Sequence, residues 1–260
     1  MKTGFLSRIG VASVLTIAIL AGCHIGADDS RAKFTKNEEL TAPLAGIDML
    51  SVNVRVGRIE VTAADVGQAK ISAGIEARAN TEEKAQKLGE AVRIEAEPSG
   101  HSLVVKVVKP RGFGRNDPSV NLTITVPASL GIKAEINVGD IRVAGFGGPV
   151  EARGNVGAIT CTGLRDRADL HTNVGDVRAE YASDAPAAIS IDASANVGNV
   201  ELTGPQDLSA KVSAESNVGS VSSDRPVTVS GHLKQAIRGA IGAGEGRINL
   251  RSNVGSVRIR

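Results

Sequence analysis

The motif Asn137-Val138-Gly139-Asp140-Ile141 decides the fold, because close copies of it return along the chain. The five further copies begin at Asn155, Asn173, Asn196, Asn217 and Asn253. Successive starts are 18, 18, 23, 21 and 36 residues apart. Self-similarity at about 20 residues is typical of a solenoid. Because the last gap is twice the first, we expect one degenerate copy inside it, and Ile237–Ile241 keeps the glycine and the final isoleucine.

Each copy joins two stretches in which apolar and polar residues alternate, a pattern that indicates half-buried β-strands. Around Gly139 the phase of the alternation changes by one residue, which would turn the second strand inside out unless the chain makes a corner there. Glycine permits a corner with positive φ, and we expect the preceding valine to face inward. The predicted corner residues are Gly57, Gly139, Gly157, Gly175, Gly198, Gly219 and Gly255.

Stacking these units in parallel, about 4.8 Å apart, places equivalent residues in columns. One predicted column is Ile141, Ile159, Val177, Val200, Val221 and Val257, and another is Ile132, Val150, Ala168, Ile191, Val212 and Ile248. The asparagines Asn137, Asn155, Asn173, Asn196, Asn217 and Asn253 are expected to form a hydrogen-bonded ladder. The alternative is that they form a ligand-binding stripe.

The predicted fold is therefore all-β, a single-stranded right-handed parallel β-helix over residues 45–260, with regular rungs over 129–260. The first rung lies near Leu50–Val61, with Arg55 at the asparagine position. The remainder of 45–128 is irregular, with strands and one helix near 81–92, for which Asn80 and Glu83 resemble a capping box.

The first 22 residues are typical of an export signal, with Lys2 and Arg8 preceding an apolar stretch too short for a comfortable membrane span. Leu20-Ala21-Gly22-Cys23 then resembles the lipobox of bacterial lipoproteins, which implies a diacylglycerol on the Cys23 sulfur. Acyl chains would anchor the protein to the membrane. By the same resemblance, His24 after the cysteine favours the outer membrane. Residues 23–44 are polar and predict a flexible tether.

Composition excludes several functions. Two of the 30 basic residues lie in the signal, so the rest carries 28 basic and 28 acidic side chains. A nucleic-acid-binding protein would show a basic excess. Aromatic residues make up only 2% of the chain, whereas sugar-binding sites usually expose them.

No residue pattern indicates catalysis, a cofactor or a metal site. Cys161 occupies a repeat position held by small apolar residues elsewhere, which predicts a buried side chain. Asp140 and Asp176 could suggest calcium, but the intervening copy has Ala158 and the calcium β-roll pattern is absent. The four histidines, His24, His101, His171 and His232, are predicted to be solvated surface residues without ligand spacing.

The order of motifs resembles the bacterial family of unknown function DUF4097, a β-strand-repeat, adhesin-like family. The resemblance lies in a valine-rich opening, a short helix with an acidic start, a strand that ends at Val126-Pro127, and the Gly-x-Ile/Val repeats. It implies a single-stranded β-helix in the cell envelope and brings no catalytic motif. One departure is that the family commonly has serine or asparagine before the glycine, where this chain has Val138 and its equivalents.

We therefore expect an exported, lipid-anchored, non-catalytic binding or scaffold module with an envelope protein or glycan as partner. Insertions at 111–118, 181–186 and 223–232 are candidate contact loops. One alternative is a carbohydrate-active enzyme, which requires acids from adjacent rungs to converge in a groove. Another is a sensor or accessory protein of envelope stress, which requires a specific protein partner.

Overall fold

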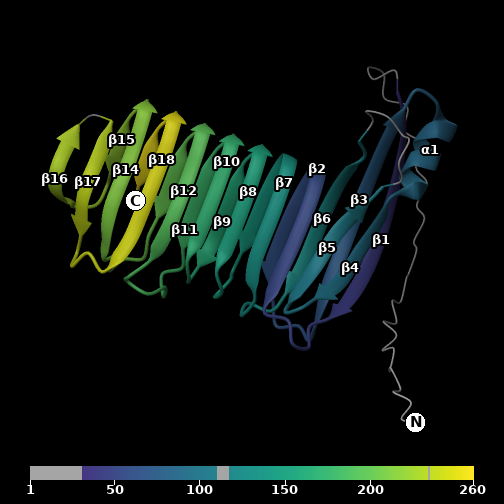
Figure 1. The fold of residues 1–260 in the computed structure, drawn as a ribbon, viewed down its shortest axis with the longest axis horizontal. Helices are drawn as coiled ribbons and strands as arrows, with labels where there is room; N and C mark the ends of the chain where they lie inside the picture. Colours follow the sequence, from purple (N-terminus) through teal and green to yellow (C-terminus); the bar gives the residue numbers. More distant parts are fainter. Residues whose placement is uncertain (1–30, 110–116, 234) are drawn as a thin grey trace, which may run out of the picture.

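The computed structural model describes residues 31–109, 117–233 and 235–260. In this part of the chain 19 strands and one helix form a long stack of strands (Figure 1). The predicted all-β class with one short helix is confirmed. A rung consists of the two strand segments on either side of one corner glycine.

The array contains seven rungs in parallel register. Two of these rungs are each formed by one long strand that continues through the corner. These strands are β2 (Met49–Ala63) and β7 (Gly131–Ala144). The others are pairs: β8 (Val150–Val156) with β9 (Ile159–Leu164), β10 (Ala168–Val174) with β11 (Val177–Tyr181), β12 (Ser190–Val197) with β13 (Val200–Thr203), β14 (Ala210–Val218) with β15 (Val221–Ser223), and β18 (Gly246–Val254) with β19 (Val257–Ile259).

The spatial order of the rungs departs from the chain order at the C-terminal end. The last rung, β18 with β19, lies between β12 with β13 and β14 with β15. The chain therefore ends within the array rather than at its tip (Figure 1). The predicted columns keep their members, but Ile248 and Val257 precede Val212 and Val221 in space.

The degenerate copy expected at Ile237–Ile241 is wrong. These residues belong to β17 (Ala236–Ile241), which runs antiparallel to β14 and to β16 (Thr228–Leu233). Gly239 is not a corner, since it has no positive φ. A side chain there would meet the Thr228 carbonyl oxygen at 2.3 Å, so this glycine permits close approach of β16.

At the N-terminal end β2 is likewise placed out of chain order, between β7 and a split rung. The split rung consists of β5 (Ser102–Val108) and β6 (Ser119–Val126), which both run parallel to β2. Beyond it lie three antiparallel strands: β4 (Arg93–Ser99) on β5, β3 (Gln68–Ala79) on β6, and β1 (Ala32–Pro43) on β3.

The tether predicted over 23–44 is wrong in its second half, because Ala32–Pro43 pair with β3 along their whole length. The inward positions of this strand hold Lys36 and Glu38 among apolar residues, which hides the alternation. Glu38 is buried, faces Lys36 Nζ and accepts a hydrogen bond from Ile94 N at 3.3 Å. These contacts tie β1 to the start of β4.

The predicted helix is α1 (Glu82–Ala91), and its N-cap is Thr81 rather than Asn80. Thr81 Oγ1 accepts a hydrogen bond from Lys84 N at 3.3 Å. The buried face of the helix, with Ala85 and Leu88, lies over β1 and β3 (Figure 1). The helix therefore covers the N-terminal end of the array.

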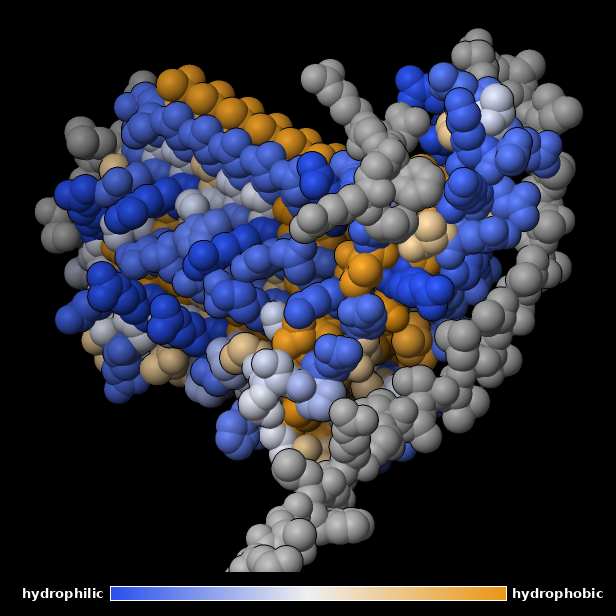
Figure 2. Space-filling model, turned by 45° about the vertical axis from the view of Figure 1, so that its right-hand side comes forward, coloured by the Kyte–Doolittle hydropathy of each residue, from blue (hydrophilic) through white to orange (hydrophobic). Residues whose placement is uncertain are grey.

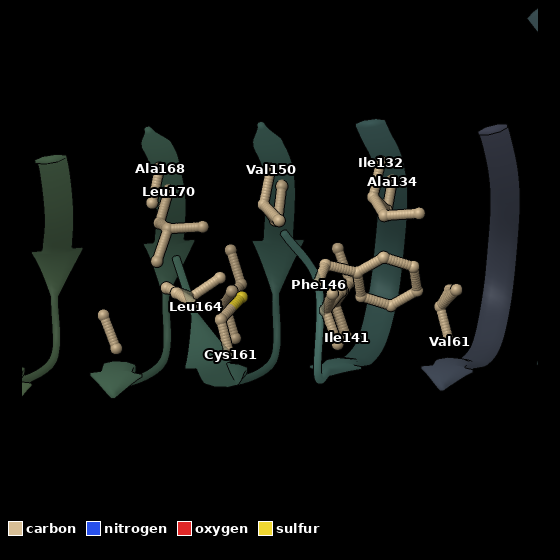
Figure 3. Close-up of a cluster of buried hydrophobic side chains, with 14 of the residues drawn as sticks. Val61, Ile132, Ala134, Ile141, Phe146, Val150, Cys161, Leu164, Ala168 and Leu170 are labelled. Atoms are coloured by element: carbon tan, nitrogen blue, oxygen red, sulfur yellow. The ribbon is translucent and has the colours of Figure 1, made fainter. Parts of the chain in front are cut away.

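The core fills the space between the first and the second strands of the rungs. Inward residues such as Ile132 and Ala134 face Ile141 and its equivalents, and Phe146 closes the layer from the connecting loop (Figure 3). Cys161 lies inside this cluster and is fully buried, as predicted. Aliphatic side chains in aligned columns thus fill the interior with almost no aromatic residue.

Candidate ligand-binding face

The corner glycines lie where the backbones of neighbouring rungs approach each other closely. All seven, from Gly57 to Gly255, have φ between 130° and 150°. A Cβ atom added at Gly139 would lie 1.6 Å from the Gly57 carbonyl oxygen, and one at Gly198 would lie 1.9 Å from that of Gly175. Both the positive φ and the contact exclude any side chain at these positions.

The valine before each glycine faces outward, so the predicted inward orientation is wrong. Six large apolar side chains are 40–62% exposed in a single column. They are Val138, Val156, Val174, Val197, Val254 and Val218 in spatial order. The corner places two consecutive residues outside, because the chain turns between the asparagine and the glycine. Figure 2 shows an apolar ridge along the upper edge of the array.

The six asparagines stand beside this ridge and bond to one another. Five of the six amide Nδ2 groups donate to the Oδ1 of the neighbouring asparagine, at distances between 2.6 and 3.2 Å. In spatial order the ladder is Asn137, Asn155, Asn173, Asn196, Asn253 and Asn217. We call the asparagine ladder and the valine column together the ladder face.

The residue before the asparagine faces the core, and three rungs have a hydroxyl there. Thr172 Oγ1 donates to the Gly157 carbonyl oxygen at 3.0 Å. Ser216 Oγ donates to Gly255 O at 2.7 Å, and Ser252 Oγ to Gly198 O at 2.8 Å. These buried hydroxyls satisfy carbonyl groups at the corner of a neighbouring rung, a role that the sequence analysis missed.

The residue after the glycine forms a second polar column, which explains the aspartates considered for calcium. Asp140 Oδ1 accepts a hydrogen bond from Ala158 N at 3.1 Å, and Asp176 Oδ1 accepts one from Asn199 N at 2.8 Å. Their carboxylates thus bond to the backbone of the next rung. Among the described residues no group of three or more His, Cys, Asp or Glu side chains could hold a metal ion.

Two histidine contacts on the outer face of the first strands were not anticipated. His171 Nδ1 lies 2.6 Å from Ser194 Oγ on the adjacent rung, and its Nε2 lies 2.5 Å from Asp169 Oδ1. The order of groups resembles a serine hydrolase relay. Such catalysis also needs an oxyanion hole, whereas backbone N–H groups inside a sheet bond to neighbouring strands. We interpret the three residues as a surface hydrogen-bond network.

A groove of about 680 Å³ opens at the N-terminal end of the ladder. Its polar lining comes from β2, β7 and β8, and consists of Asn53, Arg55, Glu135, Asn137, Arg153 and Asn155. A second groove, of about 490 Å³, lies on β1, β3 and β6 and includes Glu39 and Lys70. Each groove contains a single carboxylate, whereas glycoside hydrolysis commonly requires two.

Two titratable side chains, Cys161 and Tyr181, are buried in the core. Burial raises the pKa of the Cys161 thiol to about 12, so the sulfur is not a nucleophile at neutral pH. Burial also raises the pKa of Tyr181, whose hydroxyl donates to the Ser190 carbonyl oxygen at 3.1 Å. This bond holds the 181–186 insertion against the array.

The other predicted sites are only partly within the described residues. Cys23 lies outside them, as does most of the 111–118 loop. The remainder of that loop contains Asp117, whose Oδ2 lies 2.8 Å from Arg55 Nε. The 223–232 insertion contains the end of β15 and most of β16. The described residues contain no helix that is both long and apolar enough to span a membrane.

The family match follows the regular part of the array. A model described as Toastrack DUF4097 matches residues 135–260, from β7 to the C-terminus. This match confirms the resemblance found in the sequence for the regular part of the array. The matched region contains six of the seven corner glycines and the whole ladder face.

Solved structures of distant proteins align with most of the chain. A proposed cell adhesion protein from Clostridium sporogenes is 12% identical, and the alignment covers 87% of this chain and 99% of that one with a TM-score of 0.46. A proposed adhesin from Bacteroides fragilis is 14% identical, with 88% and 97% covered and a TM-score of 0.40. At this distance the likeness carries no function across. No curated protein matches the chain.

Proposed function

We propose that this protein is a lipid-anchored, non-catalytic module of the bacterial cell envelope that binds a partner through its ladder face. The observation that carries the proposal is the column of six valines, each 40% exposed or more, next to the asparagine ladder. Exposed apolar patches bordered by polar residues are typical of interaction sites. Polar side chains would serve solubility better at the same corner, where the valine side chain is not needed to fill the core.

The regular register makes the ladder face stiff and flat. Parallel pairing fixes the valines Val138, Val156 and Val174 opposite one another on successive rungs. The amide ladder bonds the same rungs side by side. A pre-organised surface loses little conformational freedom on binding, which favours affinity.

Lipid attachment at Cys23 would hold the array close to the membrane. Because β1 begins at Ala32, only residues 24–31 separate the lipid from the folded body. Eight extended residues reach about 29 Å at most. The end of the array that carries β1 and α1 would therefore face the membrane, and the rungs would extend away from it, in the envelope and on the outer membrane as the residue after Cys23 favours.

We also propose that the coil is right-handed. Successive first strands such as β7 and β8 pair in parallel within one sheet, and the connection between them passes through the second strand. Connections between parallel strands of one sheet are right-handed in about 98% of cases. Vibrational and electronic circular dichroism of the purified protein, compared with known right- and left-handed β-helices, would test this sense of winding.

The binding role is tested by placing charge in the valine column. The double variant Val156→Lys and Val174→Lys should abolish capture of crosslinked partners from envelope extracts, since two ammonium groups would be desolvated in the interface. Ser222→Lys, which adds a lysine on the outer face of the second strands, is the matched control and should leave capture intact. Capture by the double variant at the level of the unchanged protein would refute the role of the ladder face.

Anchoring is tested separately with Cys23→Ser. Without the thiol no acyl chain can be attached, and the variant should move from the membrane to the soluble fraction of disrupted cells. Membrane retention of this variant would refute the lipid anchor and leave the binding role unaffected.

A further inference from the structure

We propose that the groove at the N-terminal end of the asparagine ladder binds an anionic group carried on a sugar, either a carboxylate or a phosphate. This inference rests on the proposed binding role and names the chemistry of its ligand. It follows from the direction of the amide hydrogen bonds, the groups at the end of the ladder, and the shape of the groove.

All five hydrogen bonds of the ladder point the same way. Asn155 Nδ2 donates to Asn137 Oδ1, Asn173 Nδ2 to Asn155 Oδ1, and the pattern continues to Asn217, which donates to Asn253. Asn137 Nδ2 is therefore the donor end, and it donates to no group in the described part of the chain. Asn217 Oδ1 is the acceptor end at the other tip of the ladder.

A neighbouring column supports this direction with groups whose roles are unambiguous. Asn199 Nδ2 donates to the carboxylate Oδ1 of Asp176 at 3.2 Å, and a carboxylate can only accept. Asn199 lies on the same rung as Asn196, and Asp176 lies on the same rung as Asn173. Their bond points toward the N-terminal end of the array, as the ladder bonds do.

Aligned hydrogen bonds polarise one another, so a chain of amides has a positive end at its last donor. The effect resembles the aligned peptide dipoles that favour anions at a helix N-terminus. Here Asn137, whose Nδ2 is the last donor, is one of the residues that line the groove. The ladder therefore directs its positive end at whatever ligand occupies this site.

Two guanidinium groups flank the same donor. Arg55 on β2 occupies the position that an asparagine holds in the other rungs. Arg153 lies on β8 next to the ladder. Their side chains are 68% and 52% exposed. Arg55 Nε pairs with Asp117, and a terminal nitrogen of Arg153 pairs with Glu151. The other N–H groups of each guanidinium are left for a bidentate contact.

The single carboxylate in the groove is already compensated. Glu135 Oε2 accepts a hydrogen bond from Asn53 Nδ2 at 3.1 Å, and its Oε1 lies 3.6 Å from Lys133 Nζ. With Glu135 held by these groups, the net charge of the groove lining is positive. Arg55 and Arg153 outweigh the one acid, which favours an anion over a cation.

The remaining lining favours a sugar over a bare anion. The amides of Asn53, Asn137 and Asn155 combine donors and acceptors, which suit hydroxyl groups. A groove of about 680 Å³ has the size of a small-molecule site rather than of a single ion. Because the lining extends to Asn155 on the next rung of the ladder, a longer saccharide could continue over the neighbouring rungs.

The test is calorimetric titration of the full-length protein, purified in detergent, with four probes. Trigalacturonate carries carboxylates, mannose 6-phosphate carries a phosphate, maltotriose is neutral, and inorganic phosphate lacks the sugar. We expect one of the two anionic sugars to bind at least tenfold more tightly than maltotriose and than phosphate, and which one binds identifies the anion. Equal binding of maltotriose, or of phosphate alone, would overturn the proposal.

The variants use the two ends of one ladder. Asn137→Asp replaces the free donor by a carboxylate and still accepts from Asn155, so we expect at least tenfold weaker binding. Asn217→Asp makes the same substitution at the acceptor end and should change affinity less than twofold. Arg55→Asn, which extends the ladder but removes a guanidinium, should also weaken binding tenfold.

Equal effects of Asn137→Asp and Asn217→Asp would show that the direction of the ladder is irrelevant. If the unchanged protein bound none of the sugars but still captured its partner, this site alone would be refuted. Retained partner capture in the valine variant, with sugar binding intact, would refute the apolar column as the interface and keep the groove.

Discussion

The two ends of the array are closed in related but unequal ways. At the N-terminal end three antiparallel strands and α1 cover the split rung of β5 and β6. At the C-terminal end, in the described part of the chain, the hairpin of β16 and β17 alone follows the rung of β14 and β15. In both places antiparallel strands terminate a parallel stack, because a hairpin needs only a short turn whereas another parallel strand needs a full turn of the coil.

Both ends also insert a rung out of chain order, and the insertion shows what the columns specify. The rung of β18 and β19 fits between two others because all copies present the same register, for example Val197 opposite Val254 and Val254 opposite Val218. Equivalent columns make the rungs interchangeable neighbours. The repeat therefore determines which residues stack and leaves the order of stacking to the connecting segments.

The largest expected effect is on the corners, which are alike at the two ends. Gly57→Val and Gly219→Val should each destabilise the protein by several kcal/mol, because both residues have positive φ and an added Cβ would lie 2.0 Å from a carbonyl oxygen. Denaturant unfolding followed by circular dichroism measures the change.

Gly67→Val is the control for those two variants. Gly67 lies in a turn with no atom within 4 Å of an added Cβ and no positive φ, so its substitution should change stability little. If Gly219→Val were as mild as the control, the C-terminal rung would not be held by its corner, and the likeness of the two ends would fail.

The sequence predicted the repeated part of the fold well. Period and phase located the strands on both sides of Gly139, Gly175 and the other corner glycines, because alternation and glycine placement are local signals. The direction of Val138 was mispredicted, because strict alternation cannot describe a corner at which two residues in succession point outward.

The ends and the candidate site could not be predicted in the same way. β1 contains Lys36 and Glu38 at inward positions. Their mutual ion pair and their hydrogen bonds to the backbone at the start of β4 explain why they are tolerated there. Gly239 is kept for close strand approach rather than for a corner. The groove depends on Arg55 lying beside Asn137 and Arg153, which follows from rung order and not from any local motif.

The second prediction concerns the apolar residues that hold the two caps. Leu88 of α1 is 2% exposed and Ile241 of β17 is 5% exposed. Truncation to alanine should destabilise each cap by about 2–5 kcal/mol. Because the N-terminal cap contains a helix and three strands, Leu88→Ala should loosen a larger region than Ile241→Ala.

Hydrogen exchange of backbone amides distinguishes these two regions. Faster exchange in Leu88→Ala should extend over α1, β1 and β3, and in Ile241→Ala over β16 and β17. Exchange that spreads equally through the central rungs in both variants would mean that the caps do not unfold as separate units.

The third prediction compares an outer rung with the inserted one. Ser216 of β14 and Ser252 of β18 make the same hydrogen bond to a glycine carbonyl oxygen. Each serine-to-alanine change should cost about 1 kcal/mol, since a buried carbonyl loses its hydroxyl donor. Chemical denaturation gives the cost for each variant. The inserted rung lies between two other rungs, whereas β14 has a rung on one side and the terminal hairpin on the other. Ser216→Ala alone should therefore raise local exchange in β14 without global unfolding, and a reversed pattern would contradict the observed rung order.

The smallest expected effect is a pH dependence that the two ends share. The hydrogen bond from Lys33 on β1 holds the pKa of Glu76 on β3 below its usual value, with further help from Arg78. At the other end the hydrogen bond from Arg238 on β17 lowers the pKa of Glu215 on β14. In each case a carboxylate ties a terminal strand to the strand beside it.

A lowered carboxyl pKa stabilises the folded state above the unfolded pKa of about 4.5, and the stabilisation is lost as the pH falls through the folded value. Thermal unfolding between pH 7 and pH 3 should therefore show a decrease in Tm that begins below about pH 4.5. Glu76→Gln and Glu215→Gln should each lower the Tm at pH 7 and reduce the further fall in acid. Because both pairs are partly exposed, 1 M salt should reduce the difference in Tm between each variant and the unchanged protein. A Tm unaffected by either substitution would mean that the caps are held by burial alone.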